Sequence, residues 1–302
     1  MPELPDIAIY EESLARHLGG QSLTGLRVFS PFVVRTFDPP ISSLVGRAVV
    51  GARHLGKRLV LAFDHDLFLV IHLMISGRLR LKPPGAKPPG KMGLAALDFA
   101  RGSVMFTEAS TKKRASLHVV RGEAALDAFD RGGVDPLGAT LDDFGRALTR
   151  ERHTLKRSLV DPTLFSGIGN AYSDEILHAA RLSPVKMSDK LTHEELTRLR
   201  AAAVEVLTRF TDALRREVGD GFPDEVTAFR VDMAVHGRHK LPCPRCQTPV
   251  QRIAYADNET NYCPTCQTDG KLLADRGLSR LLGKDWPKSL DELDELKRER
   301  KL

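Results

Sequence analysis

Four cysteines are the residues of this chain whose types and spacing most clearly predict chemistry. They form two CxxC pairs, "CPRC" and "CPTC", with sixteen residues between the pairs. This spacing favours a tetrahedral Zn²⁺ held by four thiolates. Two disulfides are the alternative, but the N-terminus does not read as an export signal, so we expect a reducing compartment. Because all four ligands are thiols, we expect one structural zinc ion, held by Cys243, Cys246, Cys263 and Cys266.

The N-terminal "MPELP" is a second place where chemistry is possible. If Met1 is removed, Pro2 carries a free secondary amine. An α-amino group has a pKa of about 8, against about 10.4 for a lysine side chain, so far more of it is a neutral nucleophile at pH 7. Glu3 stands beside it as a possible general acid. The alternative is a simple helix start, where proline and glutamate are both favoured.

Basic stretches indicate a possible anionic partner. The net charge is +6 and the pI is about 9.2. The excess is concentrated in "STKKRAS" at 110–116 and "RALTRERHTLKR" at 146–157. Either stretch is solvated surface or a phosphate contact, and charge alone does not separate the two. No run of about eighteen apolar residues occurs, so we expect no membrane span and a cytoplasmic protein.

The elements that must position these residues follow in a clear order. Residues 6–18 predict a helix with Asp6 as its cap, and short β-type runs between 24 and 122 predict a two-sheet sandwich or barrel. After a linker at 132–138 the chain becomes helical to about 218, and "THEE" is a capping box for the helix at 192–217. Within this half, "DPTLFSGIGNAYSDEIL" predicts two helical segments around a glycine-rich turn.

This order resembles the formamidopyrimidine-DNA glycosylase/endonuclease VIII family of bacterial base-excision repair enzymes. The resemblance covers roughly residues 1–268 and is carried by "MPELP", "HLGKRLV", "SGIGNAYSDEIL" and "GRHKLPCPRC…TNYCPTCQ". It implies an α+β multidomain fold: an N-terminal helix and two-sheet β-sandwich in 1–131, a helix–two-turns–helix domain in 132–222, and a four-cysteine zinc ribbon in 223–268. Residues 269–302 form an extension of unknown role, in which Trp286 is expected to dock against the protein's own body.

The resemblance also implies an activity. The chain is expected to be a monomeric bifunctional DNA glycosylase/AP lyase acting on damaged double-stranded DNA in the bacterial cytoplasm. Pro2 would attack C1′ of the damaged nucleotide, form a Schiff base and lead to β(,δ)-elimination, with Glu3 as the acid on the ring oxygen. Lys57 would contact the phosphates of the lesion. Asp6 stands where the family has glutamate and keeps the carboxylate.

The glycine-rich turn is implied to grip the DNA backbone. By resemblance, Asn170 hydrogen-bonds a phosphate beside the lesion, Gly169 lets the backbone approach closely, and Lys156 reaches the same strand. Glu175 follows on the next helix. It either orients the site or is a surface acid, and the residues alone leave both open.

Two departures from the family concern DNA contacts. Asn258 stands where the family's zinc ribbon has an arginine, so phosphate grip should be weaker unless Arg252 substitutes. Where the family inserts a Met-Arg-Phe trio into the duplex, this chain has "HLMISG", which puts Ile75 in the methionine's place and Met74 in the glycine's. The cation of that trio would come from Lys112, Lys113 or Arg114, and no phenylalanine follows.

The connection "GDGFPDEVTAF" at 219–229 is short, whereas 8-oxoguanine-specific members carry a longer loop that closes over the flipped purine. We therefore expect good activity on abasic sites, ring-opened formamidopyrimidines or oxidised pyrimidines, and less on 8-oxoguanine. Two other classes remain as alternatives. One is a non-catalytic damaged-DNA-binding protein of the same fold, and the other is a generic zinc-ribbon protein that binds RNA.

Overall fold

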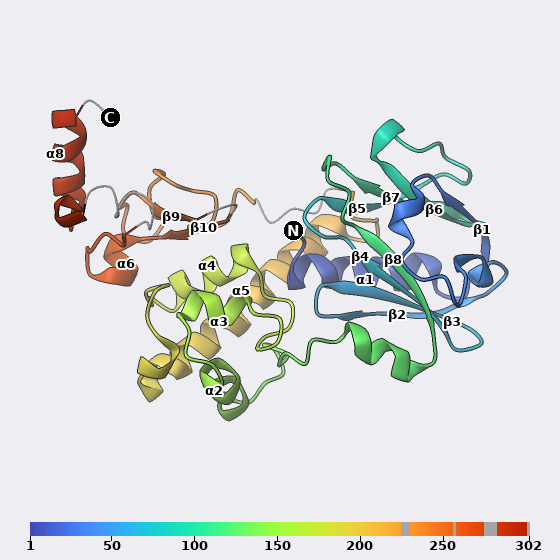
Figure 1. Cartoon of the computed structure of the whole chain (residues 1–302), viewed down its shortest axis with the longest axis horizontal. Coiled ribbons are helices and arrows are strands. Elements are labelled where there is room, and N and C mark those ends of the chain that lie inside the picture. The colour runs from blue at the N-terminus through green and yellow to red at the C-terminus, as the bar shows by residue number, and fades with distance from the viewer. Residues whose placement is uncertain (225–229, 256–257, 275–282, 301–302) are drawn as a thin grey trace. The chain divides into compact units, whose positions relative to one another are not determined.

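The computed structural model describes residues 1–224, 230–255, 258–274 and 283–300 (Figure 1). The chain divides into two compact units. The first unit comprises Met1–Gly133 and Thr208–Ala228, and the second comprises Val134–Leu207 and Phe229–Leu302. The long helix α5 (His193–Val218) contributes residues to both units.

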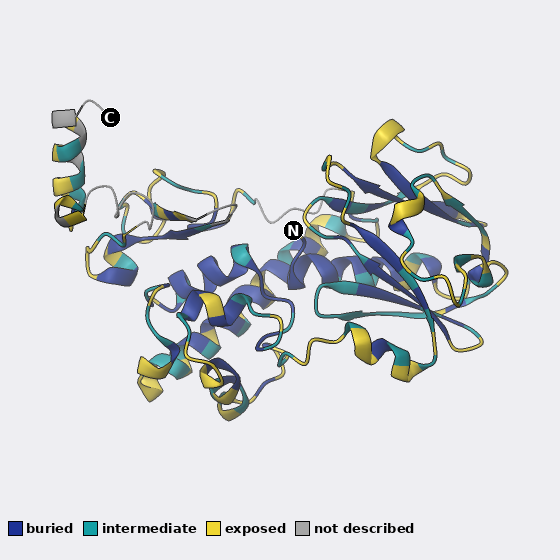
Figure 2. Cartoon of the chain, in the orientation of Figure 1, coloured by how far each residue is buried: buried dark blue, intermediate teal, exposed yellow. Residues whose placement is uncertain are grey.

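The described part of the first unit contains a β-sandwich of two four-stranded antiparallel sheets. One sheet has the order β1 (Leu23–Val28), β6 (Gly93–Phe99), β7 (Gly102–Glu108), β5 (Gly77–Lys82); the other has β2 (Val49–Leu55), β3 (Arg58–Phe63), β4 (Leu67–His72), β8 (Ser116–Arg121). Alternate side chains point into one core, as the mutually opposed Leu59, Ile71 and Leu117 do (Figure 2). The predicted two-sheet sandwich is confirmed.

Helix α1 (Leu4–Leu18) packs against the sandwich, and it begins earlier than predicted. Glu3 is the N-cap, and Asp6 occupies the third helical position instead of the cap. An Asp6 carboxylate oxygen accepts the backbone N–H of Glu3 at 2.8 Å. Pro5 is tolerated in this first turn because its missing N–H would have had no helical partner there. The expectation that Asp6 caps the helix was therefore wrong.

The second unit begins with short helices: α2 (Leu141–Thr149), α3 (Leu155–Val160) and α4 (Asn170–Ala179). The predicted capping box of α5 is confirmed, since Thr192 and Glu195 exchange side-chain to backbone hydrogen bonds of 2.9 and 3.2 Å. The described residues of the two units also form short 3₁₀ helices: η1 (Pro31–Val33), η2 (Ile41–Leu44), η3 (Gly90–Met92), η4 (Glu123–Phe129), η5 (Ser188–Lys190) and η6 (Gly283–Asp285).

The cysteine-bearing segment of the second unit is a two-stranded ribbon of β9 (Gln251–Tyr255) and β10 (Asn258–Tyr262), followed by α6 (Pro264–Thr268). The C-terminal extension ends in α8 (Leu290–Arg300). It is joined to the ribbon by the Leu273 N–H, which donates to the buried Tyr262 hydroxyl at 2.8 Å. None of the helices in the described ranges is long and apolar enough to cross a lipid bilayer.

Candidate active site and nucleic-acid interface

The amino terminus lies in a charged environment, in which Met1 is 38% exposed and Pro2 is buried. Burial lowers the pKa of the Met1 amino group, and the nearby cations of Arg78 and Lys57 lower it further. The carboxylates of Glu3 and Asp6 act in the opposite direction. Because the net effect is a lower pKa, more of this amine is neutral at pH 7 than of an ordinary terminal amine.

Two carboxylates stand on the first turn of α1 directly after Pro2. Glu3 and Asp6 are both buried, at 2% and 0% exposure. Burial raises the pKa of Asp6 to about 7, against the hydrogen bond from the Glu3 N–H, which lowers it. The second oxygen of Asp6 is buried without a hydrogen-bond partner among the described residues. A proton is therefore readily available on Asp6 near neutral pH, next to the Glu3 carboxylate.

Lys57 is presented by the two-residue turn that joins β2 to β3. Gly56 precedes it with a φ of 58°, the left-handed conformation that hairpin turns favour for glycine. His72 is near Lys57, at the end of β4. Burial lowers the pKa of His72 to about 4, and the cations of Arg58, His118 and Lys57 contribute in the same direction. His72 is thus a neutral imidazole near Lys57, a neighbour that the sequence analysis missed and that the β3–β4 register reveals.

The turn between β4 and β5 exposes the two residues expected to enter the duplex. Ile75 is 62% exposed. Met74 has a φ of 53°, in the left-handed region that a side chain disfavours. This explains why a glycine would be expected at this position, and it shows that the chain keeps the turn conformation despite the methionine.

The loop after β7 lies directly against this turn. The backbone N–H groups of Ala109 and Ser110 donate to the carbonyl and hydroxyl oxygens of Ser76, at 3.4 and 3.2 Å. The structure therefore brings together the two loops from which sequence analysis drew the candidate wedge. Met74 and Ile75 lie on one of them, and the basic "KKR" lies on the other.

The basic loop is shaped by a buried acid. Glu108, 1% exposed, accepts the backbone N–H groups of Arg114 and Ala115 at 3.0 and 3.1 Å. The Lys113 ammonium donates to the Glu108 carbonyl oxygen. Lys112 and Arg114 are exposed. The loop thus presents two exposed cations beside the turn, with Lys113 held closer to the backbone.

The glycine-rich turn of the second unit leads into α4. Gly167 has a φ of 79°, Gly169 is the N-cap, and Asn170 is the first helical residue. The Asn170 side-chain amide donates to the Glu259 carbonyl on β10 at 2.9 Å. The N-terminus of α4 is the positive end of its helix dipole, and such an end is the kind of site that binds phosphate.

Lys156 does not point toward solvent, as a DNA contact would require. It is 5% exposed, and its ammonium donates to the Asn170 carbonyl, the Ser173 hydroxyl and the Asp174 carboxylate at 2.6, 2.9 and 2.5 Å. These three acceptors use all three of its donors. The expectation that Lys156 reaches the DNA backbone is therefore wrong. The Lys156 ammonium binds acceptors in the first turn of α4 and so supports Asn170.

Glu175 is not a surface acid. It is 2% exposed, and its carboxylate accepts the backbone N–H groups of Ala234, Val235 and His236 at 2.8, 2.8 and 3.0 Å. Burial raises the pKa of Glu175, although the three backbone donors oppose the rise. Glu175 therefore fastens the segment before the ribbon to α4, which is a positioning role.

The four cysteines form one cluster whose sulfur atoms all lie within 4.8 Å of one another. The Cys243–Cys266 and Cys246–Cys266 sulfur distances are 4.0 and 3.5 Å. A tetrahedral zinc ion with Zn–S bonds of about 2.3 Å requires edges of about 3.8 Å, so the geometry fits. His178 Nε2 lies 3.3 Å from the Cys243 sulfur. The cluster is a site for one structural zinc ion, and the predicted ligand set is confirmed.

Three family models match the chain in the order of these elements. The formamidopyrimidine-DNA glycosylase N-terminal domain matches residues 1–114, the formamidopyrimidine-DNA glycosylase H2TH domain matches 133–218, and the zinc finger found in FPG and IleRS matches 240–268. A formamidopyrimidine-DNA glycosylase from Exiguobacterium sibiricum is 30% identical over 278 residues, which are 88% of this chain and 99% of that protein. The chain belongs to the formamidopyrimidine-DNA glycosylase family.

Other relatives agree with this assignment. An uncharacterized formamidopyrimidine-DNA glycosylase-like protein of Mycobacterium tuberculosis is 45% identical over 150 residues, 50% of this chain and 93% of that one. The Lactococcus lactis Fpg in complex with DNA containing an oxidized pyrimidine is 26% identical, with a TM-score of 0.76 over 88% of this chain and 100% of that one. The same fold is found in the L. lactis Fpg complex with abasic-site DNA, with a TM-score of 0.77 at 24% identity, covering 88% and 99% of the chains.

The ribbon carries the two residues that the sequence analysis considered in place of the family's arginine. Asn258 begins β10, and its side chain lies outside what the structure describes. Arg252, the suggested substitute for the absent arginine, lies on the partner strand and forms an exposed ion pair with Glu259 at 3.3 Å. Exposed pairs of this kind contribute at most about 1 kcal/mol, so the guanidinium can exchange the carboxylate for a phosphate.

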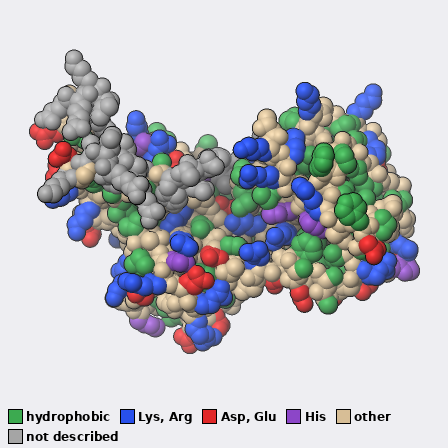
Figure 3. All heavy atoms as spheres, in the orientation of Figure 1, with side chains coloured by type: hydrophobic (Ala, Val, Ile, Leu, Met, Phe, Trp, Pro, Cys, Tyr) green, Lys and Arg blue, Asp and Glu red, His purple; other side chains and the backbone are tan. Residues whose placement is uncertain are grey.

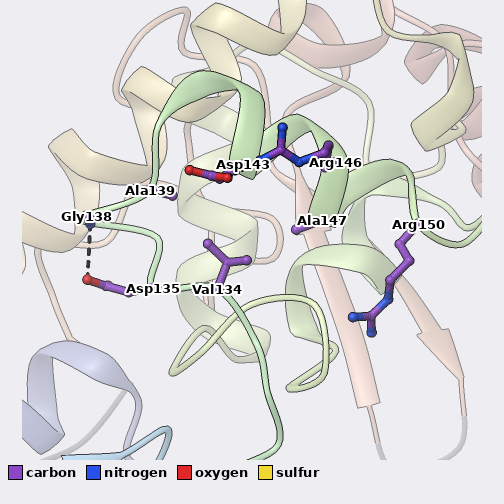
Figure 4. Close-up of a pocket in the computed structure, with 8 residues that line it drawn as sticks. All are labelled: Val134, Asp135, Gly138, Ala139, Asp143, Arg146, Ala147 and Arg150. Atoms are coloured by element: carbon purple, nitrogen blue, oxygen red, sulfur yellow. Dashed lines mark hydrogen bonds and ion pairs between the residues drawn. The ribbon is translucent and has the colours of Figure 1, made fainter.

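A cavity of about 470 Å³ lies elsewhere in the second unit, between the 134–139 segment and α2 (Figure 4). The side chain of Asp135 closes its own loop by accepting the Gly138 N–H at 3.1 Å, and Arg146 pairs with Asp143. None of the predicted site residues of the glycosylase fold lines this cavity.

Proposed function

We propose that this family member is a bifunctional DNA glycosylase and AP lyase whose nucleophile is the amine of Pro2 after removal of Met1. The observation that carries the proposal is the environment of the amino terminus: Pro2 is buried and is followed on the first turn of α1 by the buried Glu3 and Asp6, and burial and nearby cations already lower the pKa of the Met1 amine that precedes it. A nucleophilic amine has to be neutral, and a proton donor has to be within reach of the sugar.

The chemistry follows from these groups. The Pro2 nitrogen forms a bond to C1′ of the damaged nucleotide, and the bond between C1′ and the base breaks, with its electron pair leaving on the base. The nitrogen then loses its N–H proton, which neutralises the base anion, so that its lone pair is free for the next step. Glu3 gives a proton to the sugar ring oxygen, so the ring opens and a C1′=N⁺ iminium forms. The iminium makes a 2′ hydrogen acidic, and its loss as a proton expels the 3′ phosphate. Asp6, with its pKa of about 7, can return a proton to Glu3.

The same proposal assigns the DNA grip. Lys57 contacts the phosphates of the lesion, and Asn170 with the Gly169 backbone binds the neighbouring phosphate. Met74 and Ile75 fill the gap left by the extruded base, because apolar wedges of this kind stabilise an unstacked duplex. The L. lactis neighbours, solved with abasic-site DNA and with oxidized-pyrimidine DNA, support this assignment. The protein acts as a monomer in the bacterial cytoplasm.

The lesion preference is part of the proposal. The connection after α5 is short, and its residues 225–229 lie outside the described residues. A short connection favours an open pocket, so excision of ring-opened formamidopyrimidines and thymine glycol should be faster than excision of 8-oxoguanine. Equal or faster release of 8-oxoguanine from matched duplexes would contradict this preference.

Borohydride trapping tests the chemistry. Purified protein, shown by mass spectrometry to begin at Pro2, is incubated with an abasic duplex and sodium borohydride, and the covalent adduct is mapped by peptide sequencing. The adduct should be on Pro2. Glu3→Gln should lower base release by about 10²–10⁴-fold, the usual size of a lost general acid. Glu205→Gln, an exposed acid on α5, is the matched control and should keep wild-type rates.

The outcomes separate the alternatives. A protein that binds the duplex and is never trapped is a damaged-DNA-binding protein without catalysis. Trapping by a protein that still carries Met1, or on a side chain other than Pro2, would remove the proposed nucleophile. Tighter binding to RNA than to damaged duplex DNA would favour the zinc-ribbon RNA protein.

A further inference from the structure

A group of basic side chains lies on the outer face of the β2–β3–β4–β8 sheet. Arg58 on β3 is opposite His72 on β4, and His118 on β8 is opposite Val70, two residues along β4. Opposed residues point to the same face, so Arg58 and His118 share the outer face, whereas the neighbouring Leu59 points into the core. Lysine, arginine and histidine side chains are visible at many places on the side of the molecule viewed in Figure 3.

The 3₁₀ helix η4 covers the rest of this outer face and fixes the two side chains. Leu126 of η4 packs in an apolar cluster with Phe68 and other outer-face residues. At the end of η4, the Phe129 carbonyl accepts a 2.8 Å hydrogen bond from the Arg58 guanidinium, and the Phe129 ring packs edge-on against His118 at 5.0 Å. Arg58 and His118 are thus held in place by the fold.

Two further arginines complete the group, which we name the outer cation cluster: the guanidinium groups of Arg35, Arg58 and Arg131, together with the imidazole of His118. The Arg35 backbone N–H is bound to the Leu117 carbonyl at 2.9 Å, which holds the preceding loop against β8. Arg35 and Arg131 are exposed.

The three arginine charges of the cluster are not compensated, and the His118 imidazole is neutral at pH 7 because its pKa is lowered from an ordinary value of about 6.5. Burial lowers the pKa of His118, and the cations of Arg58 and Arg35 lower it further; burial and Arg131 do the same to Arg58. Among the residues that the structure describes, no carboxylate lies within ion-pair distance of Arg35, Arg58 or Arg131. Like charges gathered without an acid repel one another, and a bound anion would relieve that repulsion.

We propose that the outer cation cluster is a second phosphate-binding site, which holds a backbone phosphate of the DNA strand outside the damaged nucleotide. The inference rests on the proposed function. Lys57, assigned above to the phosphates of the lesion, lies on the turn directly before Arg58, so the cluster continues that grip along the sheet. Arginine forks match the paired oxygens of a phosphodiester, and DNA offers such a group at every step of the strand.

The test is the salt dependence of equilibrium binding to a duplex that carries an uncleavable tetrahydrofuran site. Arg35→Gln, Arg58→Gln and the variant that combines them are compared with wild type. The matched control is Arg121→Gln, which removes an exposed arginine from the opposite end of the same strand β8. Loss of the phosphate contact should make the slope of log K against log salt shallower by about 0.9 in the combined variant, with little change in Arg121→Gln.

The outcomes are decisive in both directions. Slopes of the cluster variants equal to that of Arg121→Gln would overturn the proposal. Arg35 is exposed, so Arg35→Gln remains informative even if Arg58→Gln fails to fold. If inorganic phosphate at constant ionic strength shifts the His118 resonances while the DNA slope stays unchanged, the cluster binds free anions and the proposal is wrong. The duplex is never cleaved, so failure of borohydride trapping would overturn the proposed function and leave this result intact.

Discussion

Single residues of this family member depart from the most stable choice at the places where it is proposed to touch DNA. Met74 keeps a φ of 53°, a conformation that costs an ordinary residue about 1–2 kcal/mol. Its side chain is the proposed wedge, so the strain is accepted where the side chain is used. The positive φ of Met74 is thus a structural feature of the turn that is proposed to face DNA, and the sequence pattern alone does not show it.

Substitution at Met74 separates the strain from the side chain. Met74→Ala and Met74→Gly both remove the wedge, but only glycine is relaxed at this φ. We therefore expect Met74→Gly to be more stable than Met74→Ala by about 1 kcal/mol in urea unfolding, and both to bind lesion duplex less tightly than wild type. At Ile75, which is not in the left-handed region, alanine should be at least as stable as glycine. If the glycine variant were more stable than the alanine variant at both positions, the argument that Met74 is strained would be contradicted.

Asp6 should make stability fall as pH rises. Its folded pKa is about 7, above the value of about 3.9 expected in the unfolded chain. The group therefore contributes stability that is fully present below about pH 4 and is lost as the pH rises through about 7. Asp6→Asn lacks this titration but keeps an acceptor for the Glu3 N–H. Relative to the free energy of unfolding of wild type, that of Asp6→Asn should therefore rise by on the order of 2–4 kcal/mol between pH 4 and pH 8.5. Parallel pH profiles of the two proteins would show that Asp6 titrates normally.

For single residues, the sequence was sufficient where a role depends on spacing along the chain. It was not sufficient where a role depends on contacts between residues far apart in the sequence. The four cysteines were found because a zinc site demands a ligand pattern that is visible along the chain. Lys156 was misassigned because it lies in a basic stretch, and nothing local shows that Asp174, eighteen residues later, lies within 2.5 Å of its ammonium. His72 was missed for a similar reason, since its relation to Lys57 depends on strand register.

At the scale of elements, the predictions held best where local patterns repeat. Alternating apolar residues and turn signals identified the strands of the sandwich, and the Thr192–Glu195 box identified the start of α5. The start of α1 was misplaced because two acids lie three residues apart, and either could cap a helix. The sequence also left the role of Glu175 open, because the partners of its carboxylate lie about sixty residues away.

The junction of α3 and α4 gives the sharpest prediction for an element. Lys156→Met should lower the free energy of unfolding by about 3–5 kcal/mol, because it leaves the buried Asp174 carboxylate and the Asn170 carbonyl without their cation. Arg157→Met, an exposed neighbour on the same helix, should change it by less than about 0.5 kcal/mol. Urea unfolding measures both. A Lys156→Met protein of normal stability whose DNA binding had a shallower salt slope would restore the original assignment of Lys156 as a phosphate contact.

At the scale of the whole molecule, the zinc ribbon is bound through α4 to the turn that is proposed to bind phosphate. Helix α4 carries Asn170 at its first position, bound to Glu259 of the ribbon, and Glu175 one turn later, bound to the segment before the cysteines. At its other end His178 meets Cys243. A zinc ion held by four cysteines has no open position for chemistry, yet its site supports the element proposed to hold the lesion's phosphate.

Removal of zinc should therefore act on one unit and spare the other. Metal-binding energy is folding energy for a site of this kind, so a chelator strong enough to extract zinc should unfold the ribbon and release the contacts of Asn170 and Glu175. Hydrogen exchange should accelerate in 230–274 and in the first turn of α4, while β1–β8 keep their protection because their core is complete without the ribbon. Binding to lesion duplex should be lost together with α4 protection, and both should return when zinc is added. If the ribbon lost its protection and α4 kept its own, the coupling through Glu175 would not exist, and the zinc would support the ribbon alone.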